Sequence, residues 1–298
     1  MSRKNKAIQQ MTIPEWERAF PTEDACIAFL VAHRWPSGQV KCPRCGSDRA
    51  YALKTMAWKW ECPDCRTGGA YRFSPIAGTI FENTNKPLRD WFRVIHLMLT
   101  SKKSLSALQV QRQLGFGSYR TAWYMCHRVR AGLANEDFRK LMGIVEVDET
   151  NIGGDDSNRH FGKKKGTKGK TIVIGAIERK GNVVARVITR ADHYDMENFV
   201  RMVCGDKVSL LATDEHHGYR HLGDTFPHGT VVHSKKQYVV GAIHTNTIEG
   251  FWSLFKRSIV GSFHQVSKKY LPLYIAEAQF RYNNRHNPNI FGAAIAGL

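Results

Sequence analysis

Four cysteines in this sequence have the spacing of a metal site. They form two CxxC pairs that are separated by sixteen residues: Cys42 with Cys45, and Cys62 with Cys65. Each pair puts two thiolates on one tight turn, and two such turns supply the four sulfur ligands of a tetrahedral Zn²⁺ ion. The intervening segment alternates around Trp58 and Trp60, which predicts short hairpins. We interpret the region as a structural zinc ribbon, with a redox dithiol or an iron–sulfur cluster as alternatives.

Three acidic residues stand where a folded sheet could hold catalytic groups. Asp148 follows the apolar run IVEV, Asp214 follows VSLLAT, and Glu249 lies near the start of an amphipathic helix. A sheet fixes the backbone at a strand end while the side chain there meets solvent. Three converging carboxylates would repel one another without cations, and Mg²⁺ ions would neutralise them and bind the oxygens of a phosphodiester. Taken singly, each acid also fits an ordinary surface position.

The composition favours a nucleic-acid partner. The 298 residues include 44 Lys and Arg against 26 Asp and Glu, which gives a formal net charge of +18. Cations that contact phosphates release condensed counterions, so such an excess favours binding to double-stranded DNA. The hydrophobic fraction of 42% is sufficient for a sizeable core and argues against global disorder.

The sequence also indicates in which cellular compartment the protein works. No apolar run reaches the roughly 20 residues of a membrane span, and no hydrophobic stretch follows the first basic residues as in a signal peptide. Cys26, Cys126 and Cys204 stand outside the two pairs and are interpreted as small buried residues. This usage of cysteine favours metal binding in a reducing compartment. We expect a cytoplasmic, nucleoid-associated protein with no membrane partner.

The elements that must position these residues fall into three regions. Residues 1–80 contain the zinc ribbon. Residues 81–142 are predicted to be helical, with a helix from Pro87 and two further helices at about 104–114 and 119–133, separated by Gly-Phe-Gly-Ser. This pattern is typical of a helix-turn-helix, whose second helix would present Arg120 and Arg128 to DNA. A plain helical hairpin with a solvated basic face is the alternative.

Residues 143–298 change to a strand-rich pattern. The predicted order β-β-β-α-β-α-β-α indicates an α/β fold, with a mixed sheet flanked by helices. A polar loop within this region contains Lys163, Lys164 and Lys165, which are candidate DNA contacts and otherwise a solvated run of charge.

Considered together, these motifs resemble the bacterial DDE transposases with an N-terminal zinc ribbon, the insertion-sequence fifteen-ninety-five type. The matching stretches extend from Cys42 to Arg285: CPRCG, CPDC, VEVDET followed by GG, TDEHHGY, HTNTIEGFWSLFKR and RYNNR. The resemblance implies a ribonuclease-H-like catalytic domain over residues 143–298. It further implies metal-dependent cleavage at the 3′ ends of an insertion sequence and direct joining to target DNA. Mg²⁺ would be the catalytic ion, with Mn²⁺ able to replace it, and homo-oligomers would bring two DNA ends together.

The resemblance leaves two residues open as the third metal ligand. Members of the family often have Asn in place of the third acid, which is Asn246 here. We favour Glu249, because a carboxylate binds Mg²⁺ better than an amide and its offset of 35 residues from Asp214 suits that role. Asn246 is then either a neutral ligand or the N-cap of the helix. Glu149 is left out of the site because adjacent strand residues point to opposite faces.

Two further expectations concern basic residues. Lys256 is seven positions beyond Glu249, on nearly the same helix face, and would contact a DNA phosphate unless it is only a surface lysine. The RYNNR motif, residues 281–285, has no predicted role beyond packing or a DNA contact.

Two other functions fit parts of this pattern. A ribonuclease-H-like nuclease or resolvase would share the acids and the basic surface but would cut DNA without joining it. A non-enzymatic zinc-ribbon regulator that binds DNA would need only residues 1–142, and it would leave the spacing of the acids unexplained.

Overall fold

The computed structural model describes residues 11–65, 69–134, 139–153, 170–231 and 243–296. The chain divides into two compact units, which are treated separately below. The first unit comprises the chain up to Leu133 together with the residues from His286 onward, and the second unit comprises Ala134–Arg285. Within the ranges just given, no helix is both long enough and apolar enough to cross a membrane.

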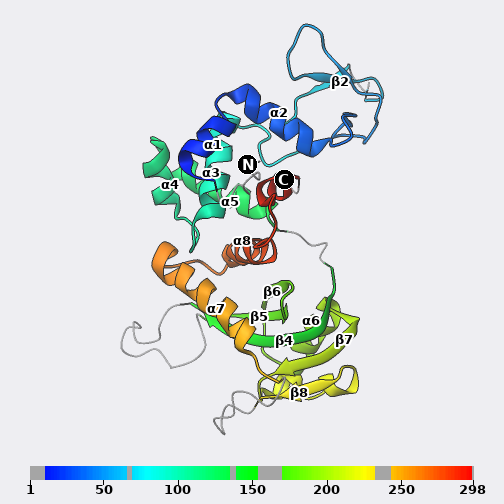
Figure 1. The fold of residues 1–298 in the computed structure, drawn as a ribbon, viewed down its shortest axis with the longest axis vertical. Coiled ribbons are helices and arrows are strands. Elements are labelled where there is room, and N and C mark those ends of the chain that lie inside the picture. The colour runs from blue at the N-terminus through cyan, green and yellow to red at the C-terminus, as the bar shows by residue number, and fades with distance from the viewer. Residues whose placement is uncertain (1–10, 66–68, 135–138, 154–169, 232–242, 297–298) are drawn as a thin grey trace, which may run out of the picture. The chain divides into compact units, whose positions relative to one another are not determined.

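The first unit contains six helices among its described residues and one small sheet (Figure 1). The helices are α1 (Ile13–Ala19), α2 (Glu23–Arg34), α3 (Leu88–Thr100), α4 (Ala107–Leu114), α5 (Tyr119–Gly132) and α9 (Ile290–Ala296). The sheet has the antiparallel order β1-β2-β3, formed by Tyr51–Ala52, Trp60–Cys62 and Tyr71–Phe73. This sheet confirms the predicted hairpins of the ribbon. Its core is built from aromatic residues and cysteines: Trp35, Trp60, Phe73, Cys42, Cys62 and Cys65.

The three predicted helices after residue 81 are present. In α3 the apolar residues at spacings of three and four are buried: Leu88, Trp91, Phe92, Ile95, Met98 and Leu99. Helix α4 begins at Ala107 because the Ser106 side chain caps it by accepting a hydrogen bond from the Gln109 N–H. It ends at Leu114, because the next residue, Gly115, adopts a φ of 65° that favours glycine. Helices α4 and α5 then pack on each other, as a helical hairpin requires.

Helix α9 belongs to the first unit, although the sequence assigned every residue from 143 onward to the catalytic domain. Its Phe291 is fully buried and forms ring contacts with Phe92 at 5.0 Å, Phe29 at 5.4 Å and Phe20 at 5.8 Å. A short apolar run such as IFGAAIA can fill either of two cores, because the hydrophobic effect is non-directional. The second compact unit of the structure spans Ala134–Arg285, whereas the predicted catalytic domain spans residues 143–298.

The second unit is built on a five-stranded sheet in the order β6-β5-β4-β7-β8. The strands are β4 (Leu141–Ile152), β5 (Thr171–Glu178), β6 (Val183–Ile188), β7 (Cys204–Thr213) and β8 (His228–Thr230). Strands β4, β5 and β6 pair antiparallel, whereas β4 with β7 and β7 with β8 pair parallel. The predicted mixed sheet is thereby confirmed. The predicted helix between the last two strands is replaced by two short 3₁₀ helices, His217–Tyr219 and Leu222–Asp224.

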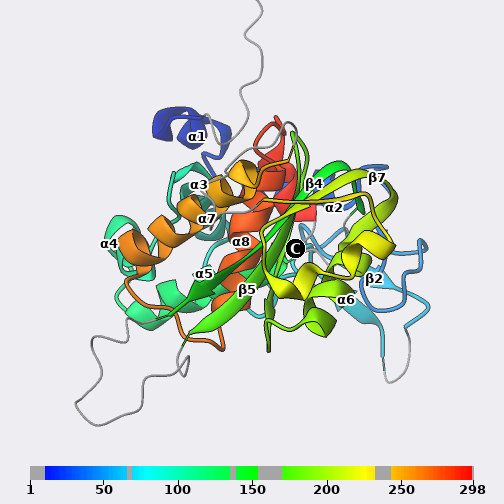
Figure 2. The same cartoon turned by 90° about the horizontal axis from the view of Figure 1, so that it is seen from below.

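Helices cover both faces of this sheet (Figure 2). Helix α6 (His193–Val203) packs on the face that contains Val145 and Val147. Helices α7 (Asn246–Ser258) and α8 (Leu271–Asn283) pack on the face that contains Ile152 and Val173. A Cβ atom at Gly175 would lie 2.6 Å from Trp252 Cζ2, so this glycine permits α7 to approach the sheet closely. Because strand residues alternate, Asp148 shares the α7 face with Ile152.

Candidate functional site

The four paired cysteines form a site with the dimensions of a zinc centre. Their sulfur atoms all lie within 4.8 Å of one another. Cys42 Sγ is 3.8 Å from Cys65 Sγ, and Cys45 Sγ is 3.7 Å from Cys62 Sγ. A tetrahedral ion with Zn–S bonds of about 2.3 Å would hold its sulfurs about 3.8 Å apart. The donor set and the spacing therefore fit Zn²⁺, as the sequence predicted.

Hydrogen bonds shape the turns that present these sulfurs. The Gly46 N–H donates to the Cys42 carbonyl at 2.9 Å, and a φ of 74° makes glycine the favoured residue at position 46. The second turn is tied to the first through Asp64, which accepts a hydrogen bond from Ser47 Oγ and pairs with Arg49. These contacts link the two turns that present the four sulfurs.

In the second unit, two of the three predicted acids converge. Asp148 lies in β4, and Asp214 follows the last residue of β7. The parallel pairing of β4 with β7 reaches Glu146 and Ala212, so both aspartates lie just past its end on neighbouring strands. A carboxylate oxygen of each lies within 4.8 Å of the other. The Asp214 carboxylate also accepts a hydrogen bond from the His216 N–H at 3.0 Å, which fixes its orientation.

Glu149 joins this cluster, and sequence reasoning missed it. Its carboxylate lies within 4.8 Å of those of Asp148 and Asp214, accepts a hydrogen bond from Tyr219 Oη at 2.7 Å and is 4.0 Å from His216 Nε2. Adjacent residues of β4 still point to opposite faces, but the last pair of β4 with β7 is Glu146 with Ala212. Past that pair, a long side chain from the other face of β4 can reach the carboxylates of Asp148 and Asp214. Two adjacent acids, Asp148 and Glu149, were the sequence signal from which Glu149 could have been identified.

The crowding of these acids affects the pKa values of Asp148 and Glu149. Burial, together with the charges of Glu149 and Asp214, raises the pKa of the Asp148 carboxyl to about 7. Burial also raises the pKa of Glu149, although the hydrogen bond from Tyr219 opposes that shift. A divalent cation between such groups favours their ionised forms. The cluster therefore has the chemistry of a site for hard metal ions such as Mg²⁺.

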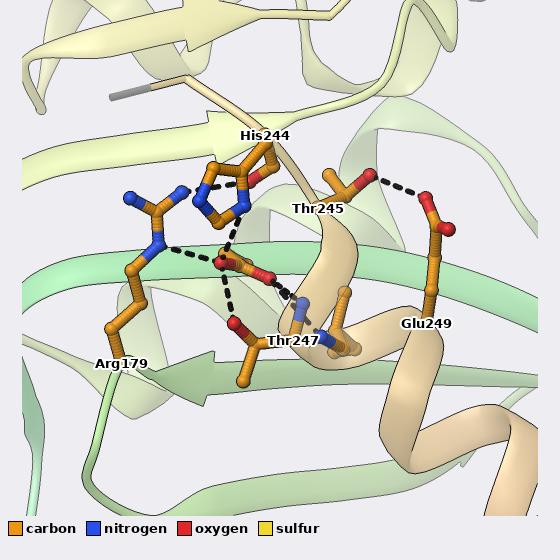
Figure 3. Close-up of polar contacts among 7 residues, drawn as sticks. Arg179, His244, Thr245, Thr247 and Glu249 are labelled. Atoms are coloured by element: carbon orange, nitrogen blue, oxygen red, sulfur yellow. Dashed lines mark hydrogen bonds and ion pairs between the residues drawn. The ribbon is translucent and has the colours of Figure 1, made fainter. Parts of the chain in front are cut away.

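The two candidates for the third ligand both lie on α7 and are exposed. Asn246 is the first residue of the helix, while the N-cap position is occupied by Thr245, whose side chain makes no capping hydrogen bond. The structure thus does not place Asn246 as the N-cap. Glu249 Oε1 accepts a hydrogen bond from Thr245 Oγ1 at 2.7 Å (Figure 3). Glu249 lies outside the 4.8 Å cluster, yet its charge contributes to the raised pKa of Asp148.

A buried carboxylate that the sequence did not single out anchors the start of α7 to the sheet (Figure 3). Glu146 in β4 has no exposed side-chain surface. It accepts hydrogen bonds from Thr247 N at 2.8 Å, Thr247 Oγ1 at 2.9 Å and Ile248 N at 3.0 Å. Arg179 Nε donates to it at 2.6 Å, and His244 Nδ1 lies 3.2 Å away. These bonds satisfy backbone donors that the first turn of any helix leaves free.

The predicted DNA contacts are distributed over both units. Lys256 is exposed on α7, and Arg120 is exposed near the start of α5. Arg128 is partly buried and donates to the carbonyls of Glu82 at 3.1 Å and Thr79 at 3.5 Å. Lys163, Lys164 and Lys165 lie outside the residues that the structure describes.

The RYNNR motif has a structural role in the second unit. The Asn283 side chain donates to the Val183 carbonyl at 2.9 Å and accepts from the Val183 N–H at 2.7 Å. Arg285 donates to the Gly181 carbonyl at 3.0 Å. Both residues thereby fix the turn between β5 and β6 against the end of α8.

Comparisons with known proteins agree with this organisation. Residues 140–283 match the family described as ISXO2-like transposase domain, and residues 21–68 match the family described as transposase zinc-ribbon domain. A protein of Halobacterium salinarum, described as an uncharacterized protein in transposable element ISH50, is 27% identical over 284 residues, which cover 89% of this chain and 92% of that protein.

A solved structure with a weaker likeness is the cryo-electron microscopy structure of the simian T-cell lymphotropic virus intasome in complex with the PP2A regulatory subunit B56 gamma. The TM-score is 0.30 and the identity 12%, over 59% of this chain and 67% of the matched chain.

Proposed function

Since this chain belongs to the insertion-sequence transposases that combine a zinc ribbon with an ISXO2-like transposase domain, we propose that it cuts the ends of its element and joins them to target DNA by metal-dependent phosphoryl transfer. The observation that carries the proposal is the convergence of Asp148 and Asp214 just past the end of the parallel pairing of β4 with β7. Two carboxylates on neighbouring strands of a rigid sheet are suited to hold divalent cations in a fixed place.

Each residue has a distinct role in this proposal. Asp148 and Asp214 hold the catalytic ions, and Glu249 completes the site from α7. Bound Mg²⁺ or Mn²⁺ would supply charge neutralisation at the attacking and leaving oxygens of the phosphodiester. Lys256, on the same helix face as Glu249, contacts a DNA phosphate and orients the strand. The protein contributes positioning and electrostatics rather than a covalent intermediate.

The remaining contacts with DNA come from outside the acidic cluster. Arg120 and Arg128 on α5, together with Lys163, Lys164 and Lys165, are proposed to bind the backbone of the element ends or of the target. Two DNA ends must be cut and joined together, so we propose that two or more copies of the chain assemble on them. Zinc binding would stabilise the folded ribbon segment of the first unit.

The test is the variant Asp148→Asn. It should abolish both cleavage and joining while leaving binding to the terminal repeats of the element unchanged, because only the metal site loses a charge. Asp224→Asn is the matched control, since Asp224 is an exposed aspartate in the same unit. Strand transfer by Asp148→Asn at the rate of the unchanged protein would contradict the site assignment.

A second assay separates the proposal from its alternatives. The protein is incubated with Mg²⁺, a precut element end and supercoiled plasmid. A transposase joins the end to the plasmid, whereas a nuclease or resolvase gives cut products only. Binding to the end without any Mg²⁺-dependent product would favour a DNA-binding regulator.

A further inference from the structure

A cavity in the first unit combines basic, aromatic and amide side chains, of which the proposed function uses only Arg120 and Arg128. It has a volume of about 630 Å³ and lies between α5 and the segment 82–86 that precedes α3. This volume is within the range of about 300–1,000 Å³ that is usual for small-ligand sites. Its lining includes three cations, two amides and an exposed ring, namely Lys86, Arg120, Arg128, Asn83, Asn85 and Tyr124. We call it the α5 cavity.

The α5 cavity is positively charged. Lys86, Arg120 and Arg128 line it, against the single acid Glu82. The guanidinium of Arg128 donates to the backbone carbonyls of Glu82 and Thr79, and not to a carboxylate. Among the described residues, none of the three cations forms an ion pair. Their charge is therefore available to an anionic ligand, and a phosphate is the anion that a basic protein of this kind meets on DNA.

Aromatic rings are the second feature of the cavity, beside its positive charge. The side chain of Tyr124 on α5 is 54% exposed. The Arg128 guanidinium lies 5.5 Å from the centre of this ring and 5.8 Å from the centre of the Trp91 ring, whose side chain is almost fully buried. Arg128 thus lies beside both aromatic rings. An exposed ring beside cations is a platform on which a nucleobase can stack.

The third feature of the cavity is a pair of side-chain amides. Asn83 and Asn85 are both exposed at the cavity and flank Thr84. Thr84 Oγ1 accepts hydrogen bonds from Trp91 Nε1 and from the Lys86 N–H, each at 3.0 Å, so the segment is held in place. In the part of the chain that the structure describes, the Asn83 and Asn85 side chains make no hydrogen bond. An amide offers a donor and an acceptor, which is the pattern that reads a base edge.

We propose that the α5 cavity binds one unpaired nucleotide of DNA. Lys86 and Arg120 contact its phosphate, Tyr124 stacks on its base, and Asn83 or Asn85 bonds to the base edge. A paired base within a duplex has both faces covered by its neighbours, so only an unpaired nucleotide can use the ring of Tyr124. The proposal rests on the proposed function to this extent, that staggered cuts in the two strands of an element end leave such unpaired nucleotides.

The test compares two DNA substrates with the zinc-loaded full-length protein. One is a blunt duplex of the element end, and the other is the same duplex with a three-nucleotide single-stranded overhang. Fluorescence anisotropy should give a Kd about tenfold lower for the overhang, which is what one stacked base supplies. Tyr124→Ala should remove this preference, and Tyr124→Phe should keep it because the ring remains.

A matched control lies on the same helix. Tyr119 is 50% exposed in α5 but does not line the cavity, so Tyr119→Ala should keep the preference for the overhang. Equal losses in Tyr119→Ala and Tyr124→Ala, or no preference in the unchanged protein, would overturn the proposal. Free deoxyadenosine monophosphate is a further probe. If it binds with the same Kd as the overhang substrate, the cavity is a site for a free nucleotide, and its assignment to DNA is overturned.

Strand transfer measured on the same preparations separates this proposal from the proposed function. Joining of precut ends without any preference for the overhang would refute the nucleotide site alone. A preference for the overhang that Tyr124→Ala removes, in a protein that joins no ends, would support the nucleotide site and contradict the transfer activity.

Discussion

The carboxylate of Glu146 accepts a hydrogen bond from the backbone N–H of Ile248 at 3.0 Å, although 102 positions separate the two residues in the chain. The bond joins the strand that contains Asp148 to the first turn of the helix that contains Glu249. Glu146 lies two residues before Asp148, and Ile248 lies one residue before Glu249. The distance between the proposed metal ligands therefore depends on a residue that is itself no ligand.

Replacing Glu146 tests this relationship. Glu146→Ala removes the partner of a largely buried arginine, Arg179, so we expect a loss of roughly 3–5 kcal/mol in the free energy of unfolding. Urea unfolding measures this loss. Glu146→Gln keeps the shape and part of the hydrogen bonding, so it should fold while strand transfer needs a higher Mg²⁺ concentration. Glu178→Gln is the control, because its partner Arg139 is exposed and such pairs contribute about 0–1 kcal/mol. An unchanged Mg²⁺ requirement in Glu146→Gln would show that Glu146 does not position the ligands.

The identity of the third ligand can be decided by three substitutions. Glu249→Gln should abolish strand transfer, because it removes the carboxylate proposed to complete the site. Asn246→Ala should retain activity within a few-fold, and Glu149→Gln should lower activity about 10- to 100-fold, as partners of metal ligands usually do. Rates over a series of Mg²⁺ and Mn²⁺ concentrations provide the measurement. Activity in Glu249→Gln combined with loss in Asn246→Ala would assign the position to Asn246.

The zinc site has its own prediction. The purified chain should contain one Zn²⁺ ion, measured by elemental mass spectrometry, and Cys62→Ser should lose it. Because metal binding and folding are linked in small metal sites, the loss should make the segment around Trp60 sensitive to protease. Cys126→Ala is the control, since Cys126 is a buried residue of α5 outside the four-cysteine cluster. Full retention of zinc by Cys62→Ser would contradict the assignment.

Two other cysteines should be unreactive in the folded protein. Burial raises the pKa of Cys26 and of Cys204 from 9.0 to about 12 in each case. Both thiols are therefore protonated at pH 8, and iodoacetamide should alkylate them only after unfolding in urea, as mass spectrometry can show. Labelling of either cysteine in the native protein would contradict its burial in the fold.

The same shifts have a consequence for stability. A folded-state pKa above the unfolded value means that the native state holds the proton more tightly. The stabilising contribution is complete below pH 9 and is lost as the pH rises toward 12. Urea unfolding at pH 8 and at pH 10.5 should show this decline, and Cys204→Ala should reduce it.

Local patterns in the sequence were sufficient for much of the fold. The cysteine spacing predicted the ribbon, the apolar periodicity predicted α3 and α7, and alternating runs ahead of Asp148 and Asp214 predicted the strands that bring these acids together. Each of these signals acts within one element or between neighbouring ones. The family resemblance supplied the order of the remaining motifs.

Other features depend on contacts that no local pattern encodes. Glu146 resembles a polar position on a strand until its partners are known, and those partners are about 100 residues away in sequence. Glu149 was excluded by the alternation of strand side chains, which does not take account of how far its carboxylate reaches past the last pair of β4 with β7. Helix α9 joins a core determined by Phe20, Phe29 and Phe92, far from it along the chain.

The position of α9 has a consequence for the synthesis of the protein. Residues of the first unit emerge from the ribosome first, but their core is completed only by Phe291, after the whole second unit has been translated. At usual rates of about 5–20 residues per second, the aromatic rings that Phe291 covers would wait for roughly ten seconds or more. During this interval a nascent chain exposes apolar surface that the finished protein hides. Chaperones and proteases can act on that surface, so the abundance of the protein would depend on how fast the intervening residues are made.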